Sequence, residues 1–449
     1  MREARQMNAP EPTIETAPAA APQSTGAQRP PWLWIPTLYF AEGLPNAIVV
    51  TVSLVMYKDL GLSNTANTFW TSLLYLAWVV KPLWSPFVDI LGTRRRWTWV
   101  TQLLMAVALA GVAMRVPMPD MLPWTLAFFW LIAFTSATHD IAADGFYMLA
   151  LDPSRQALYV GIRTLFYRLS AMFASGLFLL WAGRMIEHSG GPAAGWSVAI
   201  GGLAGIMGVL GVWHALSLPK PVSDHPSDAR RVGEMLREFG ATFTTFFQKP
   251  GIGRLLAFLL LYRFGEAQLV KMVAPFLKDA RDVGGLGLTT AQFGTIYGIW
   301  GIAALSVGGI LGGIVTSRDG LRRWLWPMVF ALHLPDLVFL YFAYAQPTNM
   351  MLIQAGVMIE QFGYGFGFTA YVMYMLYLSR GQHQTAHYAI CTGFMAMGLM
   401  FPGMWSGWLQ DHIGYKHFFA WVIVATLPGF WVAARVPLEE NFGKKAAKA

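Results

Sequence analysis

The sequence predicts an all-α membrane protein, with about twelve transmembrane helices arranged as two pseudo-symmetric six-helix bundles. Three observations lead to this fold class. The 449 residues are 55% hydrophobic and only 12% charged, whereas soluble domains carry about 25% charged residues. The apolar residues collect into long segments, and segments of the second half of the chain repeat those of the first. Such a composition is typical of a protein whose side chains face lipid as well as one another.

The apolar segments are long enough to span a bilayer. A helix needs about 20 residues to cross roughly 30 Å of hydrocarbon, and the chain contains about twelve segments of that kind. We expect the spans at 32–57, 66–91, 97–116, 121–150, 157–186, 194–217, 252–277, 290–315, 324–345, 350–379, 384–411 and 415–436.

Hydrophilic sequence lies at both ends and once in the middle. Residues 1–30 are rich in Ala, Pro and polar residues and lack the apolar core of a signal peptide, so we expect a disordered cytoplasmic tail. A cytoplasmic linker at 219–251 separates an N-terminal bundle at 31–218 from a C-terminal bundle at 252–437. Residues 438–449 form a second cytoplasmic tail.

The basic residues predict that both termini are cytoplasmic, because cytoplasmic loops carry an excess of Lys and Arg. In this orientation the cytoplasmic side receives Arg94, Arg95, Arg96, Arg155, Arg230, Arg231, Arg237, Lys249, Arg318, Arg322, Arg323, Arg380, Lys444 and Lys445. The opposite side receives only scattered basic residues, namely Lys58, Arg115, Arg184, Lys278, Arg281 and Lys416. We therefore expect an integral protein of a bacterial inner (cytoplasmic) membrane.

The composition also limits cofactors and partners. The pI of 9.5 is expected of an inner-membrane protein, so it does not indicate binding to nucleic acid. A lone cysteine, Cys391, rules out a disulfide framework or a thiolate metal site. His139 stands beside Asp140 without a second histidine at ligand spacing, so we expect no metal site. We expect no cofactor, and a monomer surrounded by membrane lipid.

The two halves repeat one another in sequence. "LYFAEGLP" of the first span has a counterpart in "LYRFGEAQ" of the seventh, which aligns Glu42 with Glu266. "VDILGTRRRW" resembles "VTSRDGLRRW", and "QALYVG" matches "TAHYAI", at nearly the same offset. Two parallel six-span repeats joined by a long inside loop resemble the arrangement of major facilitator superfamily transporters.

The loop "SPFVDILGTRRRW" resembles that superfamily's signature between its second and third helices. The superfamily's pattern is a glycine, an aspartate and clustered arginines. Asp89 and Arg94 to Arg96 match the aspartate and the arginines, while Ser85 or a neighbour stands in place of the glycine. The resemblance implies that this loop latches the halves together and gates the cytoplasmic side. The alternative is a basic loop that only sets topology.

Charged residues inside the spans are candidate functional residues, because a charge at the bilayer centre costs at least about 2.5–3.5 kcal/mol. From the helix rise, Asp140 and Arg168 lie about 15–17 Å deep, and Asp144 and Arg163 about 10 Å deep. These depths predict an ion-pair ladder between spans four and five, with Asp140 opposite Arg168 and Asp144 opposite Arg163. Asp140 and Asp144, at i and i+4, share one helix face.

Glu42 lies at a similar depth, in a segment loosened by Gly43 and Pro45. Its nearest basic candidate is Lys81. Glu42 is therefore either a proton carrier or half of a permanent Glu42–Lys81 ion pair. We expect Glu42, Asp140 and Asp144 to be the proton-coupling residues.

The second half places charges on the spans that line the central cavity in the superfamily arrangement. Arg263 and Lys271 are positioned to receive an anionic substrate, although Glu266 could neutralise Arg263. The complete set of expected substrate-binding residues is Tyr39, His139, Arg263, Glu266, Lys271, Glu360 and Tyr364.

Span ten contains Gly363, Gly365 and Gly367 between aromatic residues. These glycines indicate close helix packing, a surface on which sugar rings stack, or a place where the helix bends.

The motifs "FAEGLP", "KPLWSPFVDILGTRRRW" and "SATHDIAADGFYMLAL" together resemble the AmpG-type permease group of the superfamily. Asp140 and Asp144 match the two acids of the group's fourth helix, and His139 replaces its usual glutamine. The resemblance implies proton-driven import of anhydromuropeptides by alternating access. Import of siderophores or other small metabolites, or export, is the alternative. A membrane enzyme would need a nucleophile–base set or a cofactor motif, and the sequence shows neither, so we do not expect an enzyme. A receptor would normally add a soluble domain, whereas this sequence has only a short tail and one modest loop.

Overall fold

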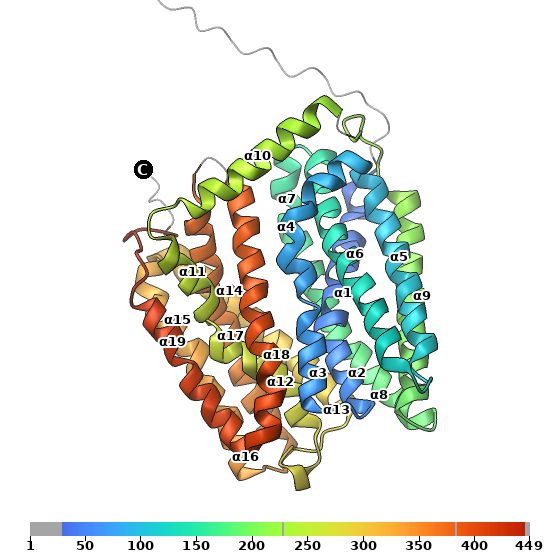
Figure 1. The fold of residues 1–449 in the computed structure, drawn as a ribbon, viewed down its shortest axis with the longest axis vertical. Helices are drawn as coiled ribbons and strands as arrows, with labels where there is room; N and C mark the ends of the chain where they lie inside the picture. Colours follow the sequence, from blue (N-terminus) through green and yellow to red (C-terminus); the bar gives the residue numbers. More distant parts are fainter. Residues whose placement is uncertain (1–28, 227–228, 382–383, 445–449) are drawn as a thin grey trace, which may run out of the picture.

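The computed structural model describes residues 29–226, 229–381 and 384–444. These residues form helices and connecting turns, and no strand occurs among them. Figure 1 shows the helices running roughly side by side, with the N-terminal half of the chain on one side of the molecule and the C-terminal half on the other. Most of the tail predicted at 1–30, and the last residues of the tail at 438–449, lie outside the described residues.

The first half crosses the molecule six times. Several passes consist of more than one helical segment, because π-turns and short breaks interrupt them. In chain order the segments are α1 (Ile35–Ala47), η2 (Ile48–Val52) and α2 (Ser53–Asp59); α3 (Asn64–Leu73) and α4 (Leu76–Leu91); α5 (Arg94–Arg115); α6 (Met121–Ala150); α7 (Pro153–Met172), η3 (Phe173–Leu177) and α8 (Phe178–His188); and α9 (Pro192–Ser217).

The second half repeats this pattern after the connecting helix α10 (Ala229–Phe247). Its segments are α11 (Ile252–Leu261) and α12 (Phe264–Lys278); α13 (Thr290–Phe293), η5 (Gly294–Gly301) and α14 (Ile302–Asp319); α15 (Leu321–His333), η6 (Leu334–Asp336) and α16 (Leu337–Ala345); α17 (Met350–Ser379); and α18 (Gln384–Ala425) with α19 (Leu427–Ala433). The helix α18 contains two passes, which meet at a turn where Gly414 has φ 72°.

The prediction of about twelve spans is confirmed by these passes. Eight helical runs among the described residues are, by length and composition alone, apolar enough to cross a membrane. Many apolar side chains point away from the protein, for example Val107, Met114 and Val209, which are 66%, 71% and 70% exposed. Side chains of this kind belong against lipid, because in water they would form an extensive exposed apolar surface.

Small residues and π-turns bring the two halves together. A Cβ atom on Gly298 of η5 would overlap the carbonyl oxygen of Ser175 in η3, and Gly176 and Gly294 meet at the same crossing. Because only glycine leaves room for this approach, span five of the first half packs backbone to backbone against span eight of the second.

The glycines of span ten have the same use within the second half. A Cβ atom on Gly363 would overlap the carbonyl oxygen of Ala331, and one on Gly365 would overlap that of Leu305. Gly367 lies against Met328 and Leu332. These contacts favour close helix packing over a sugar-stacking surface.

Candidate transport site and gate

Charged side chains of α4, α6 and α7 form a cluster inside the first half. Asp144 pairs with Arg163 at 2.5 Å, and the Tyr39 hydroxyl donates to Asp144 at 3.4 Å. The Arg163 guanidinium lies 4.5 Å from the centre of the Tyr39 ring. Asp140 pairs with Lys81 at 3.2 Å. Each acid of span four therefore has its own basic partner.

The predicted ladder is half right. The Asp144–Arg163 pair forms, whereas Asp140 pairs with Lys81 of span two and not with Arg168. Arg168 instead donates to the carbonyl oxygen of Ser306, in the second half of the chain, at 3.4 Å. Matching depth was not enough, because five residues turn a helix by about 140° beyond one full turn. Arg163 and Arg168 consequently cannot both face span four.

Glu42 lacks the partner considered for it. Lys81 binds Asp140, so a permanent Glu42–Lys81 ion pair is wrong for this conformation. The Glu42 side chain is 6% exposed, and its Oε2 atom has no hydrogen-bond partner in the described part of the chain. A buried carboxyl oxygen without a donor is uncommon in proteins and is a frequent mark of a functional group. Glu42 therefore remains the candidate proton carrier of the first half.

Two of the expected substrate contacts are buried within the first bundle. His139 is 1% exposed, and its Nε2 lies 2.8 Å from Gln102. The other end of Gln102 lies 2.7 Å from His214, which in turn contacts Thr37 at 3.0 Å. His139 thus belongs to a buried polar chain joining four spans, which corrects its assignment to the substrate site. Tyr39 is likewise 0% exposed, and it supports the Asp144–Arg163 pair.

The arginine-rich loop binds the linker and the end of span six. The backbone N–H groups of Arg94 and Arg95 donate to Asp224 at 2.8 and 2.9 Å, so Asp224 caps α5. The Arg95 side chain donates to the carbonyl oxygens of Ala215 and Leu218, near the end of α9.

Arg94 lies against Gly145 of α6, where a Cβ atom would come within 2.6 Å of the guanidinium. Arg96 donates its backbone N–H to the Thr93 hydroxyl at 3.1 Å. The side chain of Asp89 lies outside the described part of the structure. The contacts described for this loop stay within the first half and its linker, so its predicted role as a latch between the halves stays a prediction.

Arg263 caps the start of α12 and is enclosed by aromatic rings. Its Nη2 donates to the Tyr364 hydroxyl at 2.5 Å, and the guanidinium lies 4.8 Å from the centre of the Phe368 ring. Among the described residues no carboxylate lies within 4.0 Å of it, so Glu266 does not form an ion pair with Arg263. A cation held by rings and a phenol can still receive an anionic group.

Lys271 faces the first half of the chain. It is 2% exposed, and its Nζ lies 3.4 Å from the Thr71 hydroxyl and 4.9 Å from the centre of the Tyr75 ring. It also lines a small cavity between the halves, together with Thr51 and Tyr297. In the described structure no carboxylate forms an ion pair with it, which suits a group that receives an anion.

Three acids of the second half meet one another. Glu266 of α12, Asp336 of η6 and Glu360 of α17 each contribute a carboxylate oxygen to a group within 4.8 Å. Glu266 and Glu360 were expected at the substrate site, whereas nothing in the sequence placed Asp336 beside them. The signal available was the helix-breaking "HLPDL" in span nine, which turns Asp336 away from the regular helix register.

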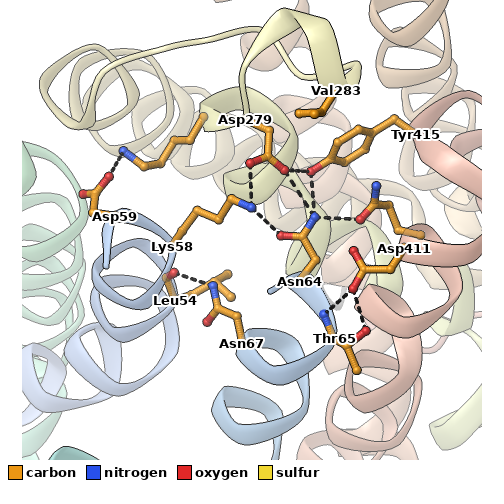
Figure 2. A network of polar contacts seen from close by, with 12 residues as sticks. Leu54, Lys58, Asp59, Asn64, Thr65, Asn67, Asp279, Val283, Asp411 and Tyr415 are labelled. Carbon is orange, nitrogen blue, oxygen red and sulfur yellow. Dashed lines mark hydrogen bonds and ion pairs between the residues drawn. The ribbon is translucent and has the colours of Figure 1, made fainter. Parts of the chain in front are cut away.

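A network of polar contacts closes the face of the molecule opposite α10 (Figures 1 and 2). Lys58, at the end of α2, pairs with Asp279, just beyond α12, at 2.6 Å. Lys278 of the second half pairs in turn with Asp59 of the first half at 2.7 Å. The two ion pairs are therefore related by the repeat of the chain. We call this set, with Asn64, Thr65, Asp411 and Tyr415, the gate.

Asn64 and Thr65, at the start of α3, complete the gate. Asn64 donates to Gln410 at 2.6 Å and to Asp279 at 3.2 Å, and the Tyr415 hydroxyl donates to Asp279 at 2.5 Å. Thr65 donates through its hydroxyl to Asp411 at 2.6 Å. Figure 2 shows Lys58, Asn64 and Tyr415 converging on Asp279.

The sequence contained a signal for the gate that composition alone did not reveal. The first and seventh spans both end in Lys-Asp, as "YKDLG" and "LKDAR". Each of these lysines is followed directly by an acid, so the end of each span carries one cation and one anion. In the described structure both ion pairs that join the halves lie at this face.

Comparisons with known proteins agree with the fold. The model of the Major Facilitator Superfamily matches residues 37–390. The anhydromuropeptide permease of Escherichia coli (strain K12) is 26% identical over 410 residues, which cover 87% of this chain and 77% of that protein. "Putative transporter AmpG 4" of Rickettsia conorii (strain ATCC VR-613 / Malish 7) is 24% identical over 404 residues, or 88% of this chain and 94% of that one.

Solved structures resemble the chain in fold. A D-xylose–proton symporter has a TM-score of 0.68 at 13% identity, and the match covers 92% of this chain and 99% of that one. A bacterial homologue of the human lysosomal transporter Spinster, in an inward-facing and unoccupied conformation, has a TM-score of 0.63 at 15% identity, with 92% and 98% covered.

Proposed function

This chain belongs to the major facilitator superfamily, and from that premise we propose that it is a proton-coupled importer of anhydromuropeptides or similar polar conjugates. It is an integral membrane transporter, and its relatives confirm the resemblance to AmpG-type permeases. We infer transport and not catalysis from the same relatives. The proposed setting is a bacterial inner membrane with both termini in the cytoplasm, as the basic residues predict.

The substrate class rests on the relatives and on two cations. One relative is named an anhydromuropeptide permease, and another is named a putative AmpG transporter. Anhydromuropeptides combine sugar rings with peptide carboxylates. Arg263, enclosed by aromatic rings, and Lys271, without a described acidic partner, suit the carboxylates of such a ligand, because cations attract carboxylates.

Proton coupling rests on Glu42, and this residue carries the proposal. Its carboxyl is buried in a cavity-lining span, and one of its oxygens has no donor, whereas Asp140 and Asp144 are both paired with cations. A carboxyl in such a place exchanges between a charged and a neutral form more readily than a paired one does. The paired acids then serve to hold spans two, four and five together.

Alternating access is the mechanism that this arrangement supports. The gate joins the ends of the two six-span halves through polar contacts, which can separate when the halves rock. By the predicted orientation the gate lies on the periplasmic side. A substrate entering from the periplasm would pass through it.

The test is uptake by purified protein in liposomes. Radiolabelled N-acetylglucosaminyl-anhydromuramyl peptide is offered with and without an imposed inward pH gradient. We expect accumulation only with the gradient, and Glu42→Gln should retain exchange of internal for external substrate while losing accumulation. Undiminished gradient-driven uptake by Glu42→Gln would remove Glu42 from the coupling mechanism.

Two further comparisons assign the substrate and the ion. Competition by an iron-loaded siderophore, but not by the muropeptide, would move the protein to another substrate class. A sodium gradient that replaces the pH gradient would replace the proton as the coupling ion. Glu440→Gln, at an exposed acid near the C-terminus, is the matched control and should transport like the original protein.

A further inference from the structure

Three carboxylates of the second half lie together inside the protein. Glu266, Asp336 and Glu360 are 0%, 0% and 1% exposed, and one oxygen of each lies within 4.8 Å of the others. Within the described part of the chain, no Lys, Arg or His nitrogen lies within 4.0 Å of them. Three buried negative charges at this spacing would repel one another strongly, because burial removes the water that screens them.

The hydrogen bonds do not compensate for this burial. Among the residues that the structure describes, both oxygens of Glu266, both oxygens of Asp336 and Oε1 of Glu360 have no hydrogen-bond partner. The remaining oxygen, Oε2 of Glu360, accepts from Gln361 at 2.9 Å. Buried polar atoms are almost always hydrogen-bonded. Because Glu266 and Asp336 receive no hydrogen bond, both side chains indicate that a further species binds among the three acids.

The first half provides an internal comparison. It also carries three acids inside its spans, Glu42, Asp140 and Asp144, but Lys81 and Arg163 pair with the last two. Among the described residues, no cation forms an ion pair with the acids of the second half. These acids are also more deeply buried than Asp140 and Asp144, whose side chains are 18% and 41% exposed.

The surrounding charged and titratable groups are directed elsewhere. Arg263 attracts Glu266 from beyond ion-pair distance, while its own hydrogen bond goes to Tyr364. The phenols of Tyr297 on η5 and Tyr364 on α17 lie close enough to the acids to interact with them electrostatically. Lys271 points to Thr71 in the first half.

His333, at the end of α15, packs against Phe430 and Gly429. It makes no ion pair with an acid in the described structure. Among the described residues, no neighbouring cation thus forms an ion pair with the cluster.

We propose that Glu266, Asp336 and Glu360 form a proton-binding site that shares protons among its carboxyls, and that coupling protons enter the second half there. This inference rests on the proposed proton-coupled function. Each added proton removes one charge. It also gives the cluster an O–H group that can donate a hydrogen bond to a neighbouring carboxylate oxygen. A bound sodium ion would remove only one charge in total and would supply no donor.

The fold is built to bring Asp336 into this site. Pro335 interrupts span nine, and the short 3₁₀ turn Leu334–Asp336 places the acid next to spans seven and ten. Gly363 of α17 lets this turn approach, because a Cβ atom there would come within 2.7 Å of Pro335. A break at this place in a membrane helix has a cost in backbone hydrogen bonds, which a proton site would explain.

The direct test is infrared difference spectroscopy of the purified full chain in lipid during pH titration. We expect the carbonyl-stretch band of protonated carboxylic acids to persist at neutral pH, where ordinary Asp and Glu are ionised. Asp336→Asn, Glu266→Gln and Glu360→Gln should each reduce that band, whereas Glu440→Gln should leave it unchanged. A neutral-pH band unaffected by all three substitutions would overturn the proposal.

A comparison of sodium buffer with choline buffer distinguishes a bound proton from a bound sodium ion, and this measurement needs no variant. The neutral-pH band should be the same in sodium and in choline buffer. Its loss in sodium alone would mean that sodium occupies the site, and the proposal would be wrong. If the variants fail to fold, the titration of the unmodified protein in the two buffers still decides between proton and sodium.

Transport assays test whether this proton site takes part in coupling. Asp336→Asn should keep exchange of the labelled muropeptide but lose pH-driven accumulation, and full accumulation would contradict the coupling role. If the unmodified protein transports no muropeptide while its neutral-pH band persists, the proposed substrate fails and the proton site stands.

Discussion

Two acids one helical turn apart, Asp140 and Asp144, bind cations from different spans. Asp144 takes Arg163 from the following helix, and Asp140 takes Lys81 from span two. Depth in the membrane follows from counting residues along each helix. The direction of a side chain around the helix, relative to its neighbours, depends on how the helices pack. The Asp144–Arg163 pair could therefore be predicted, and the partner of Asp140 could not.

A prediction at this scale concerns the Asp144–Arg163 pair. The two side chains are 41% and 29% exposed, so Asp144→Asn should cost no more than about 1 kcal/mol of folding stability. We expect it to lower muropeptide uptake by about tenfold, equivalent to roughly 1.4 kcal/mol, because Arg163 loses its orientation. Uptake in liposomes and thermal unfolding measure the two effects.

The exchanged variant Asp144→Arg/Arg163→Asp is the control for pairing. It should transport better than either single substitution. A double variant no more active than the single ones would show that the position of each charge matters and that the pair does not.

At the scale of the elements, glycines decide which helices touch. The glycines of span ten separate aromatic residues, a pattern that sequence alone leaves open between packing and ligand stacking. The structure shows each of them against a neighbouring backbone or side chain. The π-turns η3 and η5 act in the same way between the halves, where Gly176, Gly294 and Gly298 allow direct backbone contact.

Gly298→Ala should disturb the closed state of the gate. The added methyl group would overlap the carbonyl oxygen of Ser175, and overpacking of this kind costs about 1–3 kcal/mol. We expect the variant to separate the halves more often. A cysteine placed at Thr65 should then react faster with a membrane-impermeant thiol reagent.

The protein's own Cys391 is 0% exposed and should give little background in this measurement. Gly313→Ala is the matched control, because a Cβ atom there would meet nothing within 4 Å. Equal labelling of the two alanine variants would contradict the predicted effect.

At the scale of the whole molecule, the repeat of the chain produces the gate. Lys58 and Lys278 end equivalent spans, and each binds the aspartate that follows the other. The symmetry of the two pairs means that neither half can close the face alone. Opening the gate must break both pairs together with the contacts of Asn64 and Thr65.

Charge reversal tests this arrangement. The four side chains of the two ion pairs are 6–16% exposed, and removal of one partner of a buried pair costs about 3–5 kcal/mol. Lys58→Asp should therefore shift the molecule away from the closed gate and increase thiol labelling at residue 65. Lys58→Asp combined with Asp279→Lys should restore slow labelling. Labelling that stays fast in the double variant would show that these charges do not hold the gate.

The sequence by itself determined the all-α membrane fold, the approximate extents of the twelve spans and the repeat of the two halves. These properties depend on composition and periodicity along the chain, which lipid and helix geometry translate directly into structure. Tertiary structure alone decided that Lys81 binds Asp140, that His139 belongs to a buried polar chain and that Asp336 joins Glu266 and Glu360. Each of these contacts depends on the rotation and approach of separate helices. Glycines, prolines and π-turns set that packing through contacts between segments far apart in the chain.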